Sequence, residues 1–407
     1  MTRVRQRFAS EHIEDVAGAL RQELARCGLK VPPGKIAIAV GSRGIANLAT
    51  LVRETVAWVR SQGGEPFIVP AMGSHGGATA AGQQCLLEEY GITEAAVRAP
   101  IRSSLAVVEL DRGDLEIPVY MDAEAGRAAG VIVINRIKPH TSFHGRYESG
   151  LMKMMAVGLG KQRQAEAIHR FGVQGLRDLM PRVACRVARH GRILLGLGIV
   201  ENAYDQTLKI RVLPSDAIPE AEPALLDLAR SHMPRLPVED IDLLIVDEMG
   251  KDLSGLGIDP NVVGRLRIAG QPEPASPRIR LIVVRDLTAA SRGNAAGMGL
   301  ADIVIRRLFE KIDRAATYEN TLTSTFVERA KVPMIADTDR EAMGFSTRLL
   351  RDVELSDLRI VRIRSTLHLA EVLVSSAVLR DVQGLPEIEV MGPAGAWFDS
   401  HGAMQSV

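Results

Sequence analysis

The sequence has few aromatic residues, almost no net charge and no long uncharged apolar run, and each of these features excludes a class of protein. Aromatic residues make up 4% of the 407 residues, which argues against a surface that stacks nucleic-acid bases. The net charge of +1 gives no electrostatic attraction to nucleic acid or to an anionic membrane. No uncharged run approaches the roughly 18 residues that a membrane-spanning helix needs.

Cysteine is also scarce. Cys27, Cys85 and Cys185 lie far apart and form no CxxC pair, which argues against a disulfide framework, a cysteine-built zinc site and an iron–sulfur cluster. The first residues of the chain lack the apolar region of a signal peptide. We therefore expect a cytoplasmic protein that binds neither nucleic acid nor a membrane.

Apolar stretches of strand length alternate with amphipathic stretches of helix length. Strands are expected at 35–40, 66–70, 131–137, 193–200, 241–246 and 280–284, and helices at 11–29, 48–62 and 161–171. This alternation predicts parallel strands joined by helical crossovers. The proline-rich stretch 211–237 is expected to be a connector around one short helix, and Gly293-Asn294 is expected to lead into a further helix.

The chain is long enough for two domains with separate cores. We expect two α/β domains with mostly parallel sheets and the active site in the cleft between them. The first, 1–237, would carry a cofactor site. The second, 238–407, would close over the substrate, and the extreme C-terminus could pack back on the first domain.

Three of the nine histidines and two lysines fall within residues 140–171. His140, His144 and Arg146 directly follow the strand expected at 131–137, and ligands bind at the carboxyl ends of strands in open α/β sheets. Such a cluster of uncommon residue types is typical of a functional site.

Lys153 and His169 each have two possible roles. Lys153 lies among apolar residues, where it either extends its amine to the surface or, if desolvated, becomes a nucleophile for covalent attachment. Lys161 is expected to be more exposed and is the weaker candidate. His169 is either a half-buried residue on an amphipathic helix or a metal ligand, and a single histidine would need other donors to hold a metal.

Two loops after strands carry further candidates. Gly73, Gly76 and Gly77 precede a helix and suit either a tight turn or an anion that approaches backbone N–H groups, and His75 adds a titratable group there. The loop lacks GxGxxG, and the chain contains no GxxxxGK. Arg43 can either clamp a carboxylate or remain a surface arginine.

Taken together, these residues resemble the nickel-dependent lactate racemase family. In that family a lysine binds a nickel-pincer nucleotide covalently, and a histidine sixteen residues later ligates the nickel, as Lys153 and His169 are spaced here. Ser149-Gly150 before the lysine, Gly158 after it, Pro139-His140 and Met72-Gly73-Ser74-His75 also resemble family segments. The resemblance covers about residues 35–175.

The resemblance implies a cofactor and a set of residue roles. Lys153 would attach the nickel-pincer nucleotide, His169 would bind nickel, and His75 and His140 would be the acid/base pair. About three extra residues separate His140 from Lys153, so His144 competes with His140. Other expected contacts are Arg43 and Lys251 for the substrate, and Ser42, Gly73, Ser74, Gly76 and Gly77 for the cofactor.

The expected activity is that of an isomerase, a racemase or epimerase that removes hydride from a 2-hydroxy acid and returns it to the other face. Cofactor-maturation enzymes would be its partners, and lactate need not be the substrate. Two alternatives remain: a lyase or isomerase that uses His75 and Lys153 without the cofactor, and a non-catalytic protein that binds a small molecule.

Overall fold

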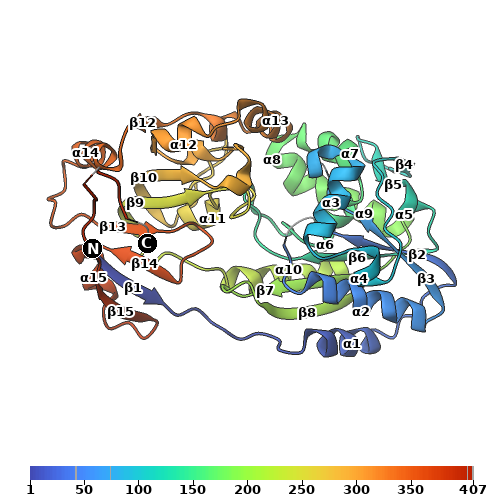
Figure 1. The fold of residues 1–407 in the computed structure, drawn as a ribbon. Coiled ribbons are helices and arrows are strands. Elements are labelled where there is room, and N and C mark those ends of the chain that lie inside the picture. The colour runs from blue at the N-terminus through green and yellow to red at the C-terminus, as the bar shows by residue number, and fades with distance from the viewer. Residues whose placement is uncertain (42–43, 74, 401, 406–407) are drawn as a thin grey trace. The chain divides into compact units, whose positions relative to one another are not determined.

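The computed structural model describes residues 1–407 except 42–43, 74, 401 and 406–407. Its contacts divide the chain into an N-terminal unit, Ala9–Met233, and a C-terminal unit made of Met1–Phe8 and Pro234–Val407. Each unit contains a mostly parallel sheet with helices packed against it, so the expected α/β fold class is confirmed (Figure 1).

The N-terminal unit is built on a five-stranded sheet of order β3-β2-β6-β7-β8, in which only β8 runs antiparallel to its neighbour. Its strands are β2 (Gly34–Val40), β3 (Gly64–Pro70), β6 (Gly130–Arg136), β7 (Ile193–Glu201) and β8 (Thr207–Pro214). The apolar runs of β2 and β6 are fully buried from Ile36 to Val40 and from Val131 to Ile134. Such runs are typical of parallel strands that are covered on both faces.

Helices and a small hairpin complete this unit. The helical segments are α1 (Val16–Arg26), α2 (Leu48–Ser61), η1 (Gly76–Ala78), α3 (Ala80–Glu89), α4 (Glu94–Val97), α5 (Ala123–Gly126), α6 (Leu151–Lys153), η2 (Met154–Gly158), α7 (Lys161–His169), α8 (Gly172–Gln174), η3 (Gly175–Leu179), α9 (Met180–His190) and α10 (Ile218–Ser231). Strands β4 (Val107–Leu110) and β5 (Val119–Asp122) pair with each other.

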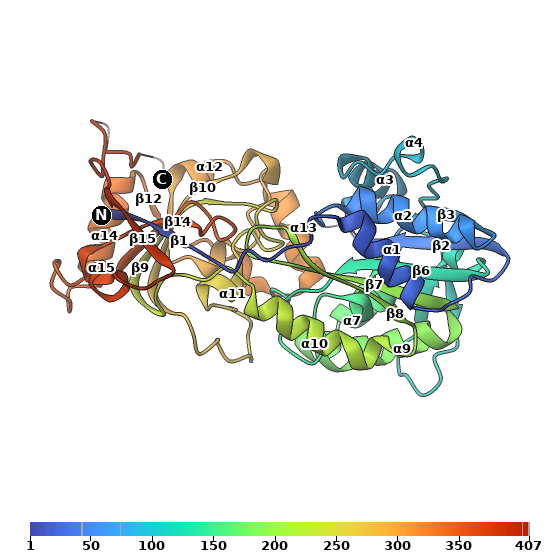
Figure 2. The ribbon, with the colours of Figure 1, turned by 90° about the horizontal axis from the view of Figure 1, so that it is seen from below.

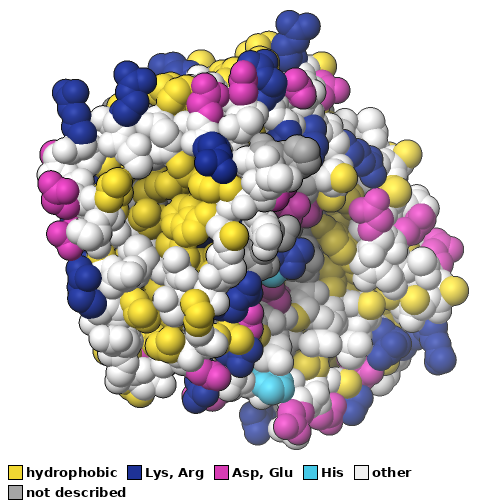
Figure 3. All heavy atoms as spheres, turned by 60° about the vertical axis from the view of Figure 1, so that its left-hand side comes forward, with side chains coloured by type: hydrophobic (Ala, Val, Ile, Leu, Met, Phe, Trp, Pro, Cys, Tyr) yellow, Lys and Arg dark blue, Asp and Glu magenta, His cyan; other side chains and the backbone are white. Residues whose placement is uncertain are grey.

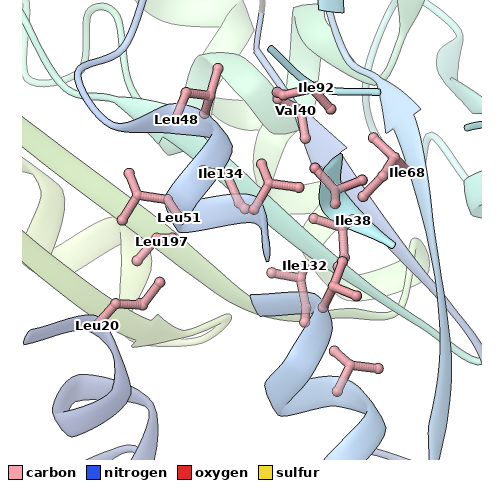
Figure 4. Packing of buried hydrophobic residues seen from close by; sticks show 14 of the residues in the cluster. Leu20, Ile38, Val40, Leu48, Leu51, Ile68, Ile92, Ile132, Ile134 and Leu197 are labelled. Carbon is pink, nitrogen blue, oxygen red and sulfur yellow. The ribbon is translucent and has the colours of Figure 1, made fainter. Parts of the chain in front are cut away.

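One face of the sheet packs against α1 and α2. Figure 4 shows Leu20, Leu48 and Leu51 of these helices turned toward strand residues that include Ile38 and Ile134. Burial of each such side chain stabilises the fold by about 1.5–3 kcal/mol. The segments α6, η2, α9 and α10 also contact the strands. Figure 2 shows α9 and α10 on the side of the sheet opposite α1 and α2. The predicted site lysine, Lys153, lies in α6.

The stretch 211–237, expected to be a connector around one short helix, contains a helix, but regular structure fills most of it. Its first part belongs to β8, and residues 218–231 form the 14-residue helix α10. Pro219 lies in the first turn, where no backbone N–H is needed. Pro223 lacks the N–H that would bond the Pro219 carbonyl, and the Tyr147 hydroxyl donates to that carbonyl at 2.8 Å instead. A tertiary contact therefore compensates for the proline within the helix.

The C-terminal unit has an eight-stranded sheet of order β12-β11-β10-β9-β13-β14-β1-β15. Its strands are β1 (Thr2–Gln6), β9 (Asp240–Met249), β10 (Arg278–Leu287), β11 (Ile303–Ile305), β12 (Met334–Ala336), β13 (Ile360–Ile363), β14 (Glu371–Val374) and β15 (Ile388–Pro393). Its helical segments are α11 (Pro260–Val263), η4 (Ala289–Ser291), η5 (Met298–Leu300), α12 (Arg306–Glu310), α13 (Arg314–Ser324), η6 (Val327–Ala330), α14 (Asp339–Leu349) and α15 (Ser376–Val382).

The N-terminal end of the chain differs from the expected domain limits of 1–237 and 238–407. Strand β1 lies between β14 and β15 and is antiparallel to both, so the first eight residues belong to the C-terminal unit. Near the other end, the Met404 N–H donates to buried Asp339 at 2.8 Å within the same unit. The chain end that joins the more distant unit in sequence is thus the N-terminus, because β1 pairs with β14 and β15 in the sheet of the C-terminal unit.

Two further sequence expectations are corrected. The helix expected over 11–29 is shorter, because the Asp15 carboxylate caps α1 by accepting the Gly18 N–H at 2.8 Å. After Gly293-Asn294 the chain forms the short η5 and then β11, which pairs in parallel with β10. Residues that the pattern assigned to a helix therefore form a strand of the sheet.

Across the described residues, no helix combines the length and apolar character needed to cross a bilayer. On the face shown in Figure 3, basic and acidic side chains are interspersed, and no extended area carries charge of one sign. This mixture agrees with the near-zero net charge of the chain.

Candidate active site

A cavity opens at the carboxyl edge of the N-terminal sheet. The chain leaves β2 for β3 on one side and later returns as β6 on the other side, so the strand order reverses at β2. Ligands bind at such switch points in open α/β sheets. The polar and titratable residues that line the cavity include His75, Arg136, Lys138, Ser149, Lys153 and His169.

Lys153 lies where α6 passes into η2, a turn of π-helix over Met154–Gly158. Such π-turns occur frequently at functional sites. Gly158 at its end allows a close approach, because a Cβ there would lie 2.8 Å from the Ala71 carbonyl oxygen. The Gly73 N–H also donates to the Gly158 carbonyl at 3.3 Å. The lysine segment is thus tied to the loop that carries His75.

His140 contacts Lys153 directly, with 2.5 Å between its Nε2 and the lysine Nζ. The other ring nitrogen, Nδ1, accepts the Ser142 N–H at 3.0 Å. A neutral imidazole in this arrangement carries its proton on Nε2, according to the hydrogen-bond network. The structure thus places the lysine amine in direct contact with the His140 imidazole.

Glu148 fixes the loop that carries both candidate histidines. Its buried carboxylate accepts the His140 N–H at 2.6 Å and the Gly145 N–H at 3.1 Å, and lies 3.2 Å from His144 Nδ1. Arg230 of α10 donates to it at 2.6 Å. Burial raises the pKa of Glu148, but the hydrogen bonds from His144, His140 and Arg230 outweigh burial and hold it below its usual value. His144 is largely exposed beside this carboxylate, whereas His140 reaches Lys153.

His169 lines the same cavity from the end of α7. Its Nδ1 is buried and has no hydrogen-bond partner in the described structure. Burial, aided by the nearby Lys153 charge, lowers the pKa of His169 to about 4. The imidazole is therefore neutral at physiological pH, which is the form that binds metals. No group of three His, Cys, Asp or Glu residues suited to a metal occurs among the described residues.

Lys161 is buried, and the expectation that it is exposed was wrong. Its Nζ lies 2.9 Å from the buried Asp122 carboxylate and also contacts the Pro70 carbonyl at the end of β3. Burial lowers the pKa of Lys161, and Asp122 opposes this shift. Gln83 lies 3.5 Å away and donates to the carbonyls of Gly73 and His75 at 3.0 and 3.3 Å. Lys161 is thus part of the framework behind the His75 loop.

The remaining predicted residues have different outcomes. Ser42, Arg43 and Ser74 lie outside the described residues. Gly73 lines the cavity. Gly76 has φ of +66°, and a Cβ there would lie 2.6 Å from the Gly82 carbonyl carbon, so this glycine serves the turn into α3. Gly77 has φ of +64° in the same turn.

Lys251, the predicted substrate contact of the second domain, belongs to the C-terminal unit. Its Nζ donates to the Gly255 carbonyl at 2.8 Å and contacts the Asn320 side chain. These contacts hold the lysine within the loop that follows β9. A role for Lys251 in substrate binding stays a prediction.

Sequence reasoning missed Arg136 and Lys138, which line the cavity, and Glu222, which lies behind it. Arg136 contacts the Glu201 carboxylate. Arg136 ends β6 and Lys138 follows it closely, as His140 does, so their place at the carboxyl end of the strand was an available signal. Glu222 had no such signal, because it lies about 70 residues beyond the lysine in the stretch taken for a connector.

Glu222 of α10 is fully buried, and its carboxyl group lies beside the first residues of α6. Its Oε2 accepts the Met152 N–H at 2.9 Å, and its Oε1 has no hydrogen-bond partner in the described structure. Burial raises the pKa of Glu222 to about 7, although bonds from Met152 and Leu151 oppose the shift. Because the folded-state pKa exceeds the unfolded value of about 4.5, this group stabilises the fold most below pH 4.5. The contribution is lost as pH rises through 7.

We therefore expect Glu222→Gln to become more stable relative to the wild type as pH rises. Glutamine can accept the same N–H groups but does not titrate. The difference in unfolding free energy should change by about 3 kcal/mol between pH 4.5 and 8, given about 1.4 kcal/mol for each pKa unit. Urea unfolding at several pH values measures it. A difference independent of pH would contradict the shifted pKa.

No protein-family model and no curated protein matches the chain. Among solved structures, the chain is similar to the lactate racemase apoprotein from Thermoanaerobacterium thermosaccharolyticum, with a TM-score of 0.55 and 12% identity over 90% of this chain and 94% of that one. A protein from Thermotoga maritima matches with a TM-score of 0.48 and 11% identity over 68% of this chain and 72% of that one. The chain therefore has an α/β fold like that of the lactate racemase apoprotein.

Proposed function

We propose that the chain is a racemase or epimerase of a 2-hydroxy acid that works with a nickel-pincer nucleotide. The observation that carries this proposal is the grouping of the chemically active residues. Lys153, His169 and His75 line one cavity, and His140 contacts Lys153. The fold is like that of a lactate racemase apoprotein, but a fold alone does not determine the reaction, so the proposal rests on these residues.

The residues fit the proposed cofactor. Lys153 supplies an amine for covalent attachment, and His169 supplies a buried, unpartnered imidazole nitrogen for nickel. Because no group of three or more His, Cys, Asp or Glu side chains suited to a metal occurs among the described residues, nickel would need further donors from the cofactor, as the sulfur and carbon atoms of a pincer would supply. Lys138, which also lines the cavity, would offer positive charge for the nucleotide phosphate. When bound, the cofactor would supply a hydride acceptor at the substrate carbon.

The protein would perform the proton transfers. A racemase needs one base on each side of the substrate, because the two enantiomers present their hydroxyl groups in different directions. His140 and His75 come from different loops, after β6 and after β3, and so suit this pair of roles. Either histidine would take the hydroxyl proton of one enantiomer, and the other would return a proton to the product. Arg43 is proposed to hold the substrate carboxylate.

We expect His140→Ala and His75→Ala each to reduce racemisation by about 10²–10⁴-fold, the usual contribution of a general acid or base. Both variants should keep the cofactor, because neither residue attaches it. His144→Ala should keep most of the activity, since His144 faces Glu148 at the surface. The exposed His12 provides a matched control for loss of an imidazole. An active His140→Ala with an inactive His144→Ala would reverse the assignment.

The test of the proposed function is co-expression with cofactor-maturation enzymes, followed by intact mass, nickel content and exchange of the α-hydrogen of 2-hydroxy acids. An added mass, about one nickel per chain and exchange are expected. Protein that stays unmodified while a lactate racemase control is loaded would overturn the proposal.

The contact between Lys153 and His140 also suits a second candidate, a cofactor-free lyase or isomerase in which the lysine attacks a substrate carbonyl. Trapping of a substrate on Lys153 by borohydride in nickel-free protein would favour it. A simple binding protein would show ligand binding without α-hydrogen exchange.

A further inference from the structure

Helix α10 presents two charged side chains to the site from one side. Glu222 and Arg230 are eight positions apart, which corresponds to about 12 Å and slightly more than two turns. Residues at such spacing share one face of a helix. Leu226, halfway between them, is buried, as expected for the face that packs on the unit. Each of the two charged residues reaches a different part of the site.

Glu222 holds the segment that carries Lys153. Its carboxylate accepts the backbone N–H groups of Met152 and Leu151, the first turn of α6. A side chain at Gly150 would overlap the unpartnered oxygen of Glu222. The φ of Gly150 is 178°, an extended value that any residue adopts. Gly150 therefore serves to leave room for the carboxylate of Glu222.

Arg230 holds the loop that carries His140. Its guanidinium donates to the Glu148 carboxylate at 2.6 Å and to the Gly145 carbonyl at 3.1 Å. Glu148 is fully buried, and an unpaired carboxylate there would be strongly destabilising. With Arg230 beside it, Glu148 can accept the His140 N–H as an anion. Arg230 thus acts on His140 through Glu148.

We propose that α10 is the positioning element of the site: Glu222 fixes the Lys153 segment, and Arg230, through Glu148, fixes the His140 loop. One helix then sets the 2.5 Å contact between Lys153 Nζ and His140 Nε2. Reactive groups must be held to within about 0.5 Å of their working geometry, and residues behind them provide this precision. The use of the contact in racemisation rests on the proposed function, but the contact itself does not.

The test uses the full-length protein without cofactor and records ¹⁵N NMR spectra of its histidine side chains. The His140 signal is identified by its loss in His140→Gln. In the wild type, His140 should show the tautomer with the proton on Nε2, because Nδ1 accepts the Ser142 N–H. Glu222→Ala and Arg230→Met should each move this signal toward an average of the two tautomers and leave the histidines outside the site unchanged.

Two controls separate positioning from general damage. Glu222→Gln should keep the wild-type signal, because glutamine accepts the same N–H groups. Glu220→Gln changes a mostly exposed residue of the same helix and should have no effect. Unchanged His140 signals in both Glu222→Ala and Arg230→Met would overturn the proposal.

Gly150→Ala tests the positioning role of Glu222 without a change in α10. This variant provides the test if the variants of α10 fail to fold. The added methyl should displace the Glu222 carboxylate and move the His140 signal. The double variant with Glu222→Ala should resemble Glu222→Ala alone, because the methyl then has room. A Gly150→Ala variant with an unchanged His140 signal would contradict the positioning role.

The kinetics of enzyme that carries the cofactor give a second readout. Glu222→Ala and Arg230→Met should lower kcat by about 10–100-fold, as the loss of supporting contacts does at other sites, with less change in KM. If the NMR shifts appear but no variant or wild type ever racemises a 2-hydroxy acid, the proposed function fails and the positioning role stands.

Discussion

Replacement of Lys153 by alanine should give a folded protein that never acquires the covalent cofactor. Lys153 is the amine that contacts His140 in the cavity, and its segment is otherwise held by backbone bonds to Glu222 and Gly150. Racemisation should fall by at least about a thousandfold, because covalent attachment provides effective concentrations of about 10⁵ M or more. Intact mass after co-expression with maturation enzymes measures the loss of the adduct.

Lys209→Ala is the matched control, since Lys209 is an exposed lysine on β8 of the same unit. It should carry the same added mass and nickel as the wild type. A Lys153→Ala protein that still carried a covalent adduct would show that another residue provides the attachment. Arginine at position 153 should fail as alanine does, because a guanidinium remains charged and is a poor nucleophile.

Lys161→Met should destabilise the N-terminal unit by about 3–5 kcal/mol, because it leaves the Asp122 carboxylate buried without its partner. Urea unfolding at pH 7 measures this loss. The effect should also reach the active site, since Lys161 contacts Pro70 and Gln83, and Gln83 bonds the carbonyls of Gly73 and His75.

The double variant Lys161→Met with Asp122→Asn should recover much of the lost stability. Asparagine removes the buried charge and can still accept the Ala125 N–H that Asp122 caps at 2.8 Å. A Lys161→Met protein that lost less than about 1 kcal/mol would show that this ion pair contributes little. Glu166 on the exposed side of α7 provides a control position, where Glu166→Gln should have little effect.

Local patterns predicted the parts of the fold that depend on neighbours in sequence. The strands β2, β3, β6 and β7 were predicted because runs such as Lys35–Val40 are apolar and rich in β-branched residues. The cluster of Lys153, His140 and His169 was predicted because these residues follow one strand within about three dozen positions. In the structure, Lys153 and His169 line one cavity, and His140 contacts Lys153.

Contacts between distant segments could not be predicted in the same way. Lys161 seemed exposed, because nothing in sequence relates it to Asp122 some forty positions earlier. The helix within 211–237 was expected to be short, because its prolines are typical of a connector. The bond from Tyr147 that satisfies the Pro219 carbonyl within the 14-residue α10 depends on the tertiary structure. The roles of Glu222 and Arg230 depend on that helix and were missed with it.

The pairing of β1 between β14 and β15 has a consequence for how the protein is synthesised. Residues 2–6 leave the ribosome about 365 residues before their partner β14 at Glu371–Val374. The N-terminal unit can acquire all of its strands while β1 waits unpaired, and the sheet of the C-terminal unit closes last. A fragment made from residue 234 onward would leave β14 and β15 without the strand between them, and these exposed edges would promote aggregation.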